Sequence, residues 1–380
     1  MNAKRMTGLA MCAALLAAAL GGASPARCEE KTAKPVVQLA ILLDTSGSMS
    51  GLIEQAKTQL WKVVNEFLSA KQRGMRPELQ VALYEYGKSS IPSSERYLRM
   101  IVPLTTDLDK VSEELFALRT NGGQEYCGAV IGAATESLKW STRPSDMKVI
   151  FIAGNEAFTQ GTVDYRSACR GAIAKGIVVN TIFCGGHASG IGGKWKAGAD
   201  LADGQYMNID HNRKVVRINA PQDTEIAKLN AELNKTYVAY GSAGKEGEAR
   251  QRAQDANAAT AAPAVVAERS AAKASANYRN SKWDLVDAVK DGKVDLDKME
   301  DAELPEEMKQ MDRAEREEYV KKQSARRDEI RAKISGLHAA RRKHVAEKRK
   351  ELAAEGADTL DQAMTKAIHE QAEKKGLELE

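Results

Sequence analysis

Residues 36–49 read Val-Val-Gln-Leu-Ala-Ile-Leu-Leu-Asp-Thr-Ser-Gly-Ser-Met, and this stretch decides the fold. Its opening apolar run has the length and composition of a strand that is buried on both faces. A chain that leaves such a strand must turn sharply, and Gly47 permits the turn. The turn gathers the carboxylate of Asp44 and the hydroxyls of Ser46 and Ser48. Oxygen ligands of this kind suit a hard divalent cation, Mg²⁺ first and Mn²⁺ or Ca²⁺ next.

The strand, the Asp-x-Ser-x-Ser spacing, the glycine and the amphipathic helix that follows occur in one order. In that order the segment resembles the first loop of the metal-ion-dependent adhesion site (MIDAS) of the von Willebrand factor A domain family. The resemblance implies a cation bound to Asp44, Ser46 and Ser48, with one position open for a carboxylate of a partner. A serine-capped turn without metal is the alternative, although capping alone does not require Asp44 and both serines.

The resemblance also implies a second ligand loop, which in the family carries a threonine three residues before a glycine that opens a helix. Counting back from Gly128 places Glu125 at that position, where it offers a charged oxygen in place of a hydroxyl. Thr120 and Gln124 are nearby alternatives. Glu125 is equally well explained as an acidic residue in the first turn of the helix, where the helix dipole favours it.

The third family loop follows a strand with Thr-Asp-Gly. Here the predicted strand 148–153 runs into Gly154, so the usual carboxylate is absent. Asn155 or Glu156 would then supply an oxygen from one or two residues later. Without either, the cation would keep more water and bind weakly.

Residues 36–240 alternate between strand-like and helical segments, which predicts an α/β fold with a doubly wound, mainly parallel sheet and helices on both faces. Ligands of such folds bind beyond the carboxyl ends of the strands. Asp44 follows such an end, so topology and resemblance point to the same site. We expect strands at 36–43, 79–86, 97–102, 148–153, 177–183 and 205–209, and helices at 52–69, 107–118, 126–140, 165–175, 194–201 and 223–233.

The composition changes after Gly241. Residues 241–278 are rich in alanine, glycine and charge, which predicts a flexible or weakly helical linker. Residues 279–380 are helical in composition and sparsely apolar, so we expect a helical hairpin, docking on the domain, or coiled-coil self-association. A basic cluster in this tail could touch anionic lipid or cell-wall polymer, but a solvated face with intervening acids is the favoured interpretation. It contains Arg341, Arg342, Lys343, Lys348, Arg349 and Lys350.

The N-terminus reads as a secretory signal peptide over residues 1–26, with a basic start, a short apolar stretch and small residues before the expected cleavage after Ala23 or Ala26. The mature chain is therefore expected in the periplasm or outside the cell, with no transmembrane segment. A lipoprotein anchored at Cys28 is disfavoured, because Pro-Ala-Arg precedes that cysteine and a lipobox wants small residues there.

Export would place four cysteines where disulfides persist: Cys28, Cys127, Cys169 and Cys184. The last three fall near strand ends or helix starts, so we expect one bridge among them, with Cys127–Cys169 as the first choice. Small buried thiols are the alternative. A zinc site is excluded in practice, since no Cys-x-x-Cys pair exists and the histidines are scattered.

A formal net charge of +4 over 380 residues argues for no particular partner, and no nucleic-acid module is present. The leading hypothesis is an exported, cation-dependent binding protein that recognises Asp or Glu on a protein partner, and not an enzyme. The alternative is a metal-free scaffold with a degenerate domain. A hydrolase that pairs Ser46 or Ser48 with His187 or His211 is the third hypothesis, and no Gly-x-Ser-x-Gly elbow supports it.

Overall fold

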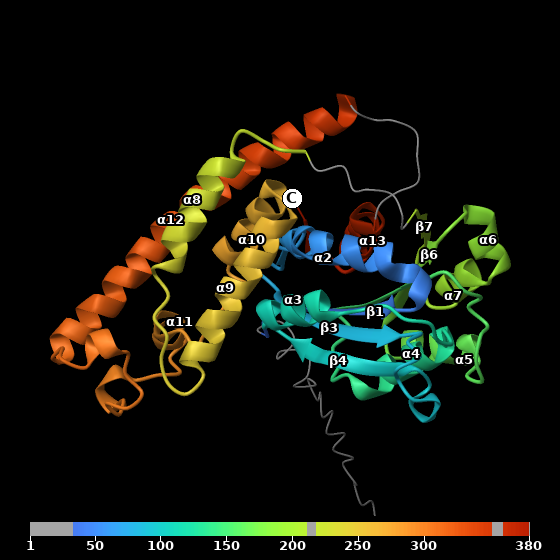
Figure 1. The fold of residues 1–380 in the computed structure, drawn as a ribbon, viewed down its shortest axis with the longest axis horizontal. Coiled ribbons are helices and arrows are strands. Elements are labelled where there is room, and N and C mark those ends of the chain that lie inside the picture. The colour runs from blue at the N-terminus through green and yellow to red at the C-terminus, as the bar shows by residue number, and fades with distance from the viewer. Residues whose placement is uncertain (1–32, 211–217, 352–359, 380) are drawn as a thin grey trace, which may run out of the picture. The chain divides into compact units, whose positions relative to one another are not determined.

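A computed structural model of the chain describes residues 33–210, 218–351 and 360–379. The described residues form a six-stranded sheet in the order β4-β3-β1-β5-β6-β7, in which every neighbouring pair is parallel except β3 and β4 (Figure 1). This confirms the predicted α/β class, and β4 adds an antiparallel edge. The strands are β1 (Val36–Asp44), β3 (Glu78–Tyr86), β4 (Leu98–Thr105), β5 (Met147–Gly154), β6 (Val178–Cys184) and β7 (Tyr206–Ile209).

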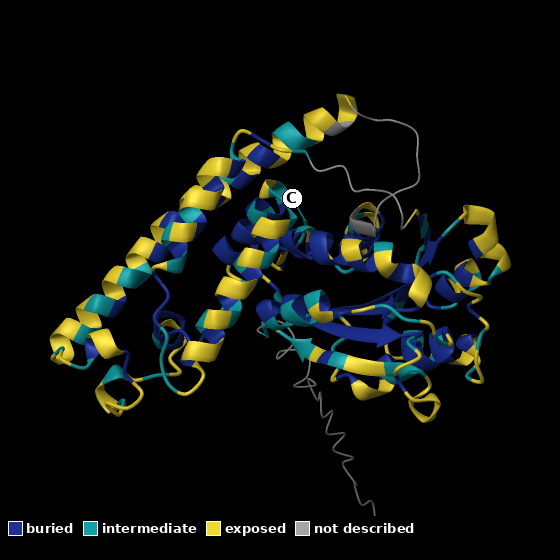
Figure 2. Cartoon of the chain, in the orientation of Figure 1, coloured by how far each residue is buried: buried dark blue, intermediate teal, exposed yellow. Residues whose placement is uncertain are grey.

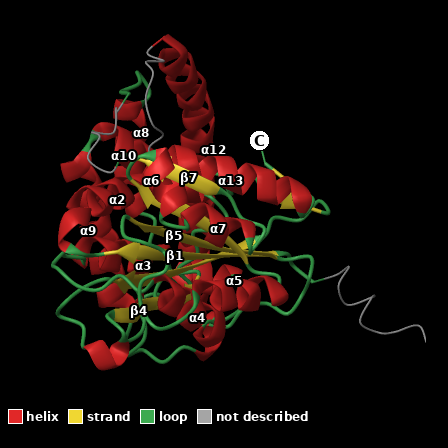
Figure 3. Ribbon diagram, turned by 90° about the vertical axis from the view of Figure 1, so that its right-hand side faces the viewer, coloured by secondary structure: helices red, strands yellow, loops and turns green. Residues whose placement is uncertain are grey.

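Alternate side chains of the buried strands serve two different cores, as the period of a strand requires. In β1, Leu39 and Ile41 pack in one core with α2, α3 and α13, and Ala40 and Leu42 pack in the other with α4, α5 and α7. Figure 3 shows α2 and α13 on one side of the sheet and α4 and α5 on the other. These helices are α2 (Ser50–Asn65), α3 (Leu108–Ala117), α4 (Cys127–Ser137), α5 (Tyr165–Ala174), α7 (Trp195–Asp200) and α13 (Leu360–Lys374).

The central strand β1 lies between β3 and β5, and the strand order reverses at this point. The chain first adds β3 and β4 on one side of β1 and then β5, β6 and β7 on the other. Its last residue, Asp44, pairs with Tyr86 at the end of β3, and Leu43 pairs with Ala153 near the end of β5. The loops after these three strands therefore meet at one edge of the sheet. This edge is the switch point at which α/β folds bind ligands.

The segment 241–278, expected to be a flexible or weakly helical linker, forms two helices, α9 (Gly244–Ala261) and α10 (Pro263–Ala274). Both carry a buried face along their length (Figure 2). The helical alternative is thus the one that holds, but a linker without packing was wrong, because charged side chains do the packing here. Arg269 and Lys273 of α10 are 1% and 0% exposed, and Arg269 bonds to Asp109 of α3 at 2.6 Å and Asp255 of α9 at 2.5 Å.

The other helices of this region pack on one another around a separate apolar cluster. Ile226 and Leu233 of α8 (Asp223–Asn234) meet Ile330 and Ile334 of α12 (Arg313–Glu351) there. The sequence had placed α8 in the α/β domain, and it belongs instead with the helical region. A short helix, α11 (Leu285–Lys290), also belongs to this region. The α/β part contains one short helix that the sequence did not predict, α6 (His187–Gly192).

The basic cluster of the tail is split by burial. Arg341 is 3% exposed and bonds to Asp223 and Glu268, each at 2.6 Å, so it takes no part in a surface patch. Arg342, Lys343, Lys348 and Lys350 are not buried. The favoured interpretation, a helix face with intervening acids, is consistent with the bond from Lys348 to Glu351 at 2.6 Å.

The last described residues return to the sheet. Helix α13 buries Met364, Ile368 and Ala372 in the same core as β1 and α2. The strand after it, β8 (Leu377–Glu378), pairs antiparallel with β2 (Lys71–Gln72), which follows α2 in the chain. The α/β domain is thus closed by a helix that the chain supplies after the whole helical region.

Three predictions fall on residues outside the described part of the chain: the signal peptide over 1–26, Cys28 and His211. Across the described residues, none of the helices combines the length and the apolar character that crossing a bilayer would require.

Candidate functional site

The first loop brings its three predicted oxygen donors together. Asp44, the last residue of β1, is 0% exposed, and its Oδ1 accepts a hydrogen bond from the backbone N–H of Ser46 at 2.7 Å. This turn carries the chain straight into a 3₁₀ turn over Gly47–Met49. The hydroxyl oxygens of Ser46 and Ser48 lie 3.3 Å apart.

The second loop contributes Glu125 and not the neighbouring alternatives. Glu125 is 5% exposed, two residues before α4 begins, and its carboxyl contacts those of Asp44 and the hydroxyl of Ser46. Its backbone N–H donates to the side-chain oxygen of Gln160. Gln124 is exposed and Thr120 is partly exposed. Of the three residues considered for this loop, Glu125 is thus the one that lies buried beside Asp44.

The third loop shows why a carboxylate is missing at position 154. A Cβ on Gly154 would lie 2.4 Å from the Oη of Tyr86 and 3.1 Å from Oδ2 of Asp44. The Tyr86 hydroxyl is fixed there because it donates to the carbonyl of Ala153 at 3.0 Å. No side chain fits at Gly154 without displacing Tyr86, so the space beside Asp44 that this position faces is filled from β3.

Of the two residues considered for the third loop, Asn155 lies against the first loop and Glu156 does not. Its Nδ2 donates to Oγ of Ser48 at 3.1 Å, which fixes the amide beside the first loop. Glu156 is exposed, and only its backbone carbonyl is engaged, by the indole N–H of Trp195 at 2.7 Å. Glu156 lies close enough for its charge to affect Glu125.

Two buried carboxyl groups in contact repel each other when both are ionised. Burial, and then the charge of Asp44, raise the pKa of Glu125 to about 9. Burial also raises the pKa of Asp44. Without a cation, one of the two carboxyls therefore holds a proton at neutral pH, and a bound divalent ion would allow both to ionise.

Three oxygen atoms of this site are buried and have no hydrogen-bond partner among the described residues: Oδ2 of Asp44, Oε2 of Glu125 and Oδ1 of Asn155. Buried acceptors without partners are costly, and each needs an explanation such as an ion or a water. One comes from each of the three loops. The donor set of two carboxylates, two hydroxyls and an amide oxygen fits a hard divalent cation.

The hydroxyl and amide oxygens are essential to that fit. Within the part of the chain that the structure describes, no group of three or more His, Cys, Asp or Glu side chains could hold a metal ion. Any cation here would thus depend on Ser46, Ser48 and Asn155 to complete the coordination begun by two carboxylates.

A buried ion-pair cluster that sequence reasoning missed supports the first loop. Glu85 of β3 is 0% exposed, and it accepts a hydrogen bond from Thr45 at 3.3 Å and from Arg99 of β4 at 2.5 Å. Lys88 adds a contact at 3.5 Å. The only signal in the sequence is a charged residue inside an otherwise apolar strand.

The three described cysteines are free and buried, so the expected bridge between Cys127 and Cys169, or between either and Cys184, is not formed in this structure. Each thiol packs inside the fold, and that of Cys127 lies 3.8 Å from Oη of Tyr86. Burial raises the pKa of all three, which leaves them as unreactive thiols.

The histidine proposed for a hydrolase lies elsewhere. His187 is exposed at the start of α6 and its ring packs on Tyr206, with ring centroids 5.3 Å apart. In the described residues, the hydroxyls of Ser46 and Ser48 bond to each other and to Asn155 and not to a histidine. Among the described residues, no histidine therefore contacts either serine.

The similarities to known proteins concern the α/β part of the chain. The family model of the von Willebrand factor type A domain matches residues 38–190. None of the curated proteins matches the chain. The chain is similar to the solved SpRpn10 VWA domain at 14% identity, covering 47% of this chain and 91% of that one, with a TM-score of 0.37.

Two bacterial structures are similar to the same extent. BatB from Bacteroides thetaiotaomicron shares 18% identity, covering 46% of this chain and 90% of that one, with a TM-score of 0.35. An aerotolerance-related membrane protein from Bacteroides fragilis NCTC 9343 shares 17% identity, over 46% and 92%, with a TM-score of 0.32. Domains of the matched family are protein-interaction modules and are often metal-dependent. Residues 38–190, with their switch-point loops and parallel sheet, are a von Willebrand factor type A domain of this chain.

Proposed function

We propose that the chain is an exported protein that binds an acidic group of a protein partner through a divalent cation, and that it is not an enzyme. The observation that carries the proposal is the convergence of three partnerless buried oxygens, from Asp44, Glu125 and Asn155, at the switch point of the sheet. The cation would be Mg²⁺, with Mn²⁺ or Ca²⁺ as substitutes.

Five residues would hold the cation: Asp44, Ser46, Ser48, Glu125 and Asn155. Glu156, exposed at the rim, would act through water if at all. The cation would supply positive charge to a carboxylate that enters from the partner. The protein's part is to keep the donors close and buried, so that the ion's remaining position faces outward.

The number of carboxylates supports a working site in spite of Gly154. The family pattern has one aspartate in the first loop, a threonine in the second and an aspartate in the third. This chain has Asp44, then Glu125, then Gly154, so the second carboxylate has moved from the third loop to the second. Tyr86 fills the space beside Gly154, which explains why a carboxylate side chain does not fit at position 154. Net charge at the site is conserved by this exchange.

The direct test is Mg²⁺ binding by titration calorimetry. The double variant Asp44→Ala/Ser46→Ala is expected to lose binding while its circular dichroism stays that of the folded protein. A matched control, Ser189→Ala/Asp200→Ala, removes the same two side-chain types from exposed positions on α6 and α7. Mg²⁺ affinity that is equal in all three proteins would refute the proposal.

A metal-free scaffold remains the second candidate, because position 154 lacks the usual family carboxylate. Crystals soaked in MnCl₂ distinguish the two, since Mn²⁺ gives an anomalous signal. A peak between Asp44 and Glu125 supports the binding protein, and a clean map at millimolar Mn²⁺ supports the scaffold.

Export and partner choice have separate tests. The basic start and apolar stretch of residues 1–26 support export, which cell fractionation and N-terminal sequencing of the mature protein would check. A pull-down from envelope extracts, with and without chelator, would find the partner. Recovery of a protein only when Mg²⁺ is present is the expected result.

A further inference from the structure

A cavity lies far from the metal-site loops, where the α/β domain meets the helical region. It has a volume of about 490 Å³. One wall comes from the amino ends of β1 and β3 and from the residues before α3, and the other from the segment 276–283. Asp44 ends β1 and Lys34 precedes it, so this cavity and the metal site occupy opposite ends of the sheet.

The lining of this cavity is positively charged. Lys34, Arg76, Arg279, Lys282 and Lys293 face three carboxylates, those of Glu78, Asp107 and Asp291. Asp107 is already engaged, because it caps α3 and pairs with Arg250 at 3.4 Å. Arg76, Lys282 and Lys293 make no ion pair within the described residues. Lys293 donates only to the hydroxyl of Ser281, at 2.6 Å.

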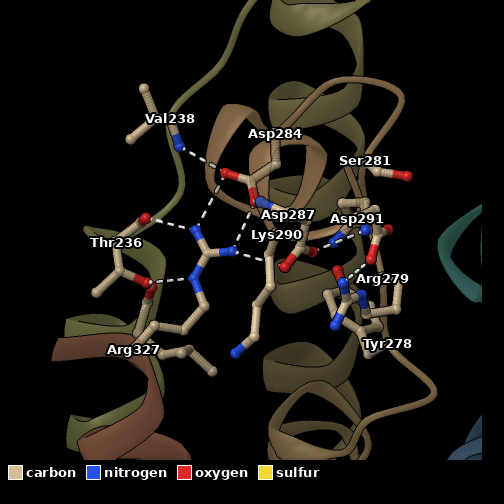
Figure 4. A network of polar contacts seen from close by, with 12 residues as sticks. Thr236, Val238, Tyr278, Arg279, Ser281, Asp284, Asp287, Lys290, Asp291 and Arg327 are labelled. Atoms are coloured by element: carbon tan, nitrogen blue, oxygen red, sulfur yellow. Dashed lines mark hydrogen bonds and ion pairs between the residues drawn. The ribbon is translucent and has the colours of Figure 1, made fainter. Parts of the chain in front are cut away.

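The wall that carries these cations is held rigidly by the buried network in Figure 4. Arg327 of α12 bonds to Asp284 at 2.6 Å and to Asp287 at 3.1 Å, and all three side chains are at most 1% exposed. Asp287 accepts in turn from the backbone N–H of Asn280 at 2.9 Å. A wall fixed in this way loses little freedom when a ligand binds.

The same wall holds an unused hydrogen-bond donor. Asn280 is 7% exposed, and its Nδ2 has no acceptor among the described residues. Trp283 is also part of the lining, and its ring packs on that of Tyr237, with ring centroids 5.7 Å apart. Excess cations, a free amide donor and an indole together suit an organic anion better than a cation or an apolar ligand.

We propose that this cavity, lined by Arg76, Lys282, Lys293 and Asn280, is a binding site for a small organic anion that carries phosphate or carboxylate groups. Its volume lies within the range of about 300–1,000 Å³ typical of small-molecule sites. The proposal is independent of the metal site, since it shares no residue with it.

The test is calorimetric titration of the full mature protein with pyrophosphate and, separately, with citrate at low ionic strength. The double variant Arg76→Ala/Lys282→Ala should bind the preferred anion at least tenfold more weakly. Both side chains are exposed, so the fold is expected to persist. The preferred anion tells whether phosphate or carboxylate is recognised.

The control variant Lys196→Ala/Lys228→Ala removes the same charge from exposed positions outside the cavity. It should bind like the wild type. Equal weakening in both double variants would show attraction to the general surface charge and would overturn the proposal. Failure of the wild type to bind either anion at millimolar concentration would overturn it as well.

Discussion

Asn180 of β6 and Gln371 of α13, 191 positions apart in the chain, exchange two hydrogen bonds in the interior of the protein. Asn180 donates to Gln371 at 3.1 Å and Gln371 donates to Asn180 at 2.6 Å. Both side chains are buried. The pair fixes the last helix to the sheet in one register, which apolar contacts alone would not specify.

Replacing one partner of this pair should be costly. Gln371→Met leaves the buried amide of Asn180 with unmet hydrogen bonds, which lowers the free energy of unfolding by about 1–3 kcal/mol. Urea denaturation followed by circular dichroism measures the change. Lys374→Met, on the exposed side of the same helix, is expected to change it by less than ~0.5 kcal/mol. A Gln371 variant as stable as the wild type would contradict the structural role of the pair.

A chain truncated after Glu351 should lose cooperative folding of the α/β domain. Without α13, the core residues of α2 and β1 that Met364 and Ile368 cover become exposed to water. We expect a broadened thermal transition and rapid proteolysis within residues 36–209. A sharp calorimetric transition at the wild-type temperature would show that the sheet does not need α13.

The crowding at Gly154 predicts a non-additive pair of mutations. Gly154→Ala places a methyl group against Oη of Tyr86 and should cost about 1–3 kcal/mol of stability. In the Tyr86→Phe background that oxygen is gone, so the same substitution should cost clearly less. The double-mutant cycle is measured by denaturation with chelator present, and additive effects would contradict the proposed contact.

Glu125→Gln should separate stability from metal binding. The variant removes the repulsion between two buried carboxyls, so with chelator its melting temperature is expected to exceed that of the wild type. Saturating Mg²⁺ should raise the melting temperature of the wild type. At a free Mg²⁺ concentration a hundredfold above Kd, the gain in the free energy of unfolding is about 2.7 kcal/mol. The variant should gain much less. An equal response to Mg²⁺ in both proteins would exclude Glu125 as a ligand.

The buried carboxylate of Glu268, outside the metal site, predicts how the stability of the protein depends on pH. Burial alone would raise the pKa of Glu268, but the hydrogen bond from His338 and the charges of His338 and Arg341 outweigh it and lower the pKa to about 2. Because the folded pKa lies below the ordinary value of about 4.3, this stabilisation is present above that value and is lost as pH falls toward 2. Roughly 3 kcal/mol at most is at stake.

The comparison of Glu268→Gln with the wild type between pH 7 and pH 3 measures this contribution. The variant should lose less unfolding free energy over that interval. Glu329→Gln, an exposed control on α12, should follow the wild-type curve. Parallel curves for all three proteins would show that Glu268 does not contribute to acid unfolding.

The secondary structure of the α/β part could be predicted from sequence because the hydrophobic periodicity of each segment agrees with its burial. Each predicted strand and helix between residues 36 and 209 is present to within a few residues, from β1 to β7. The position of Glu125 beside Asp44 was expected from the family resemblance, which places a ligand three residues before Gly128. The role of Tyr86 could not be found in this way, since it depends on the contact between β3 and the end of β5.

The helical region was harder because its interior is partly ionic. Arg269 and Lys273 look like solvent-exposed residues in a composition count, but both are buried, and each pairs with the partly buried Asp255. Only the pairing of α10 with α3 and α9 reveals them as structural. The packing of α13 on the sheet was equally invisible, since no local pattern tells which surface a short amphipathic helix will cover.

The position of α13 also affects the newly made polypeptide. A ribosome delivers the strands of the sheet well before α13, because the whole helical region lies between them in the chain. The apolar surface of β1 and α2 that α13 covers therefore stays open while that region is translated, and exposed apolar surface of this kind is prone to aggregation. Docking of α13 on the sheet closes this surface.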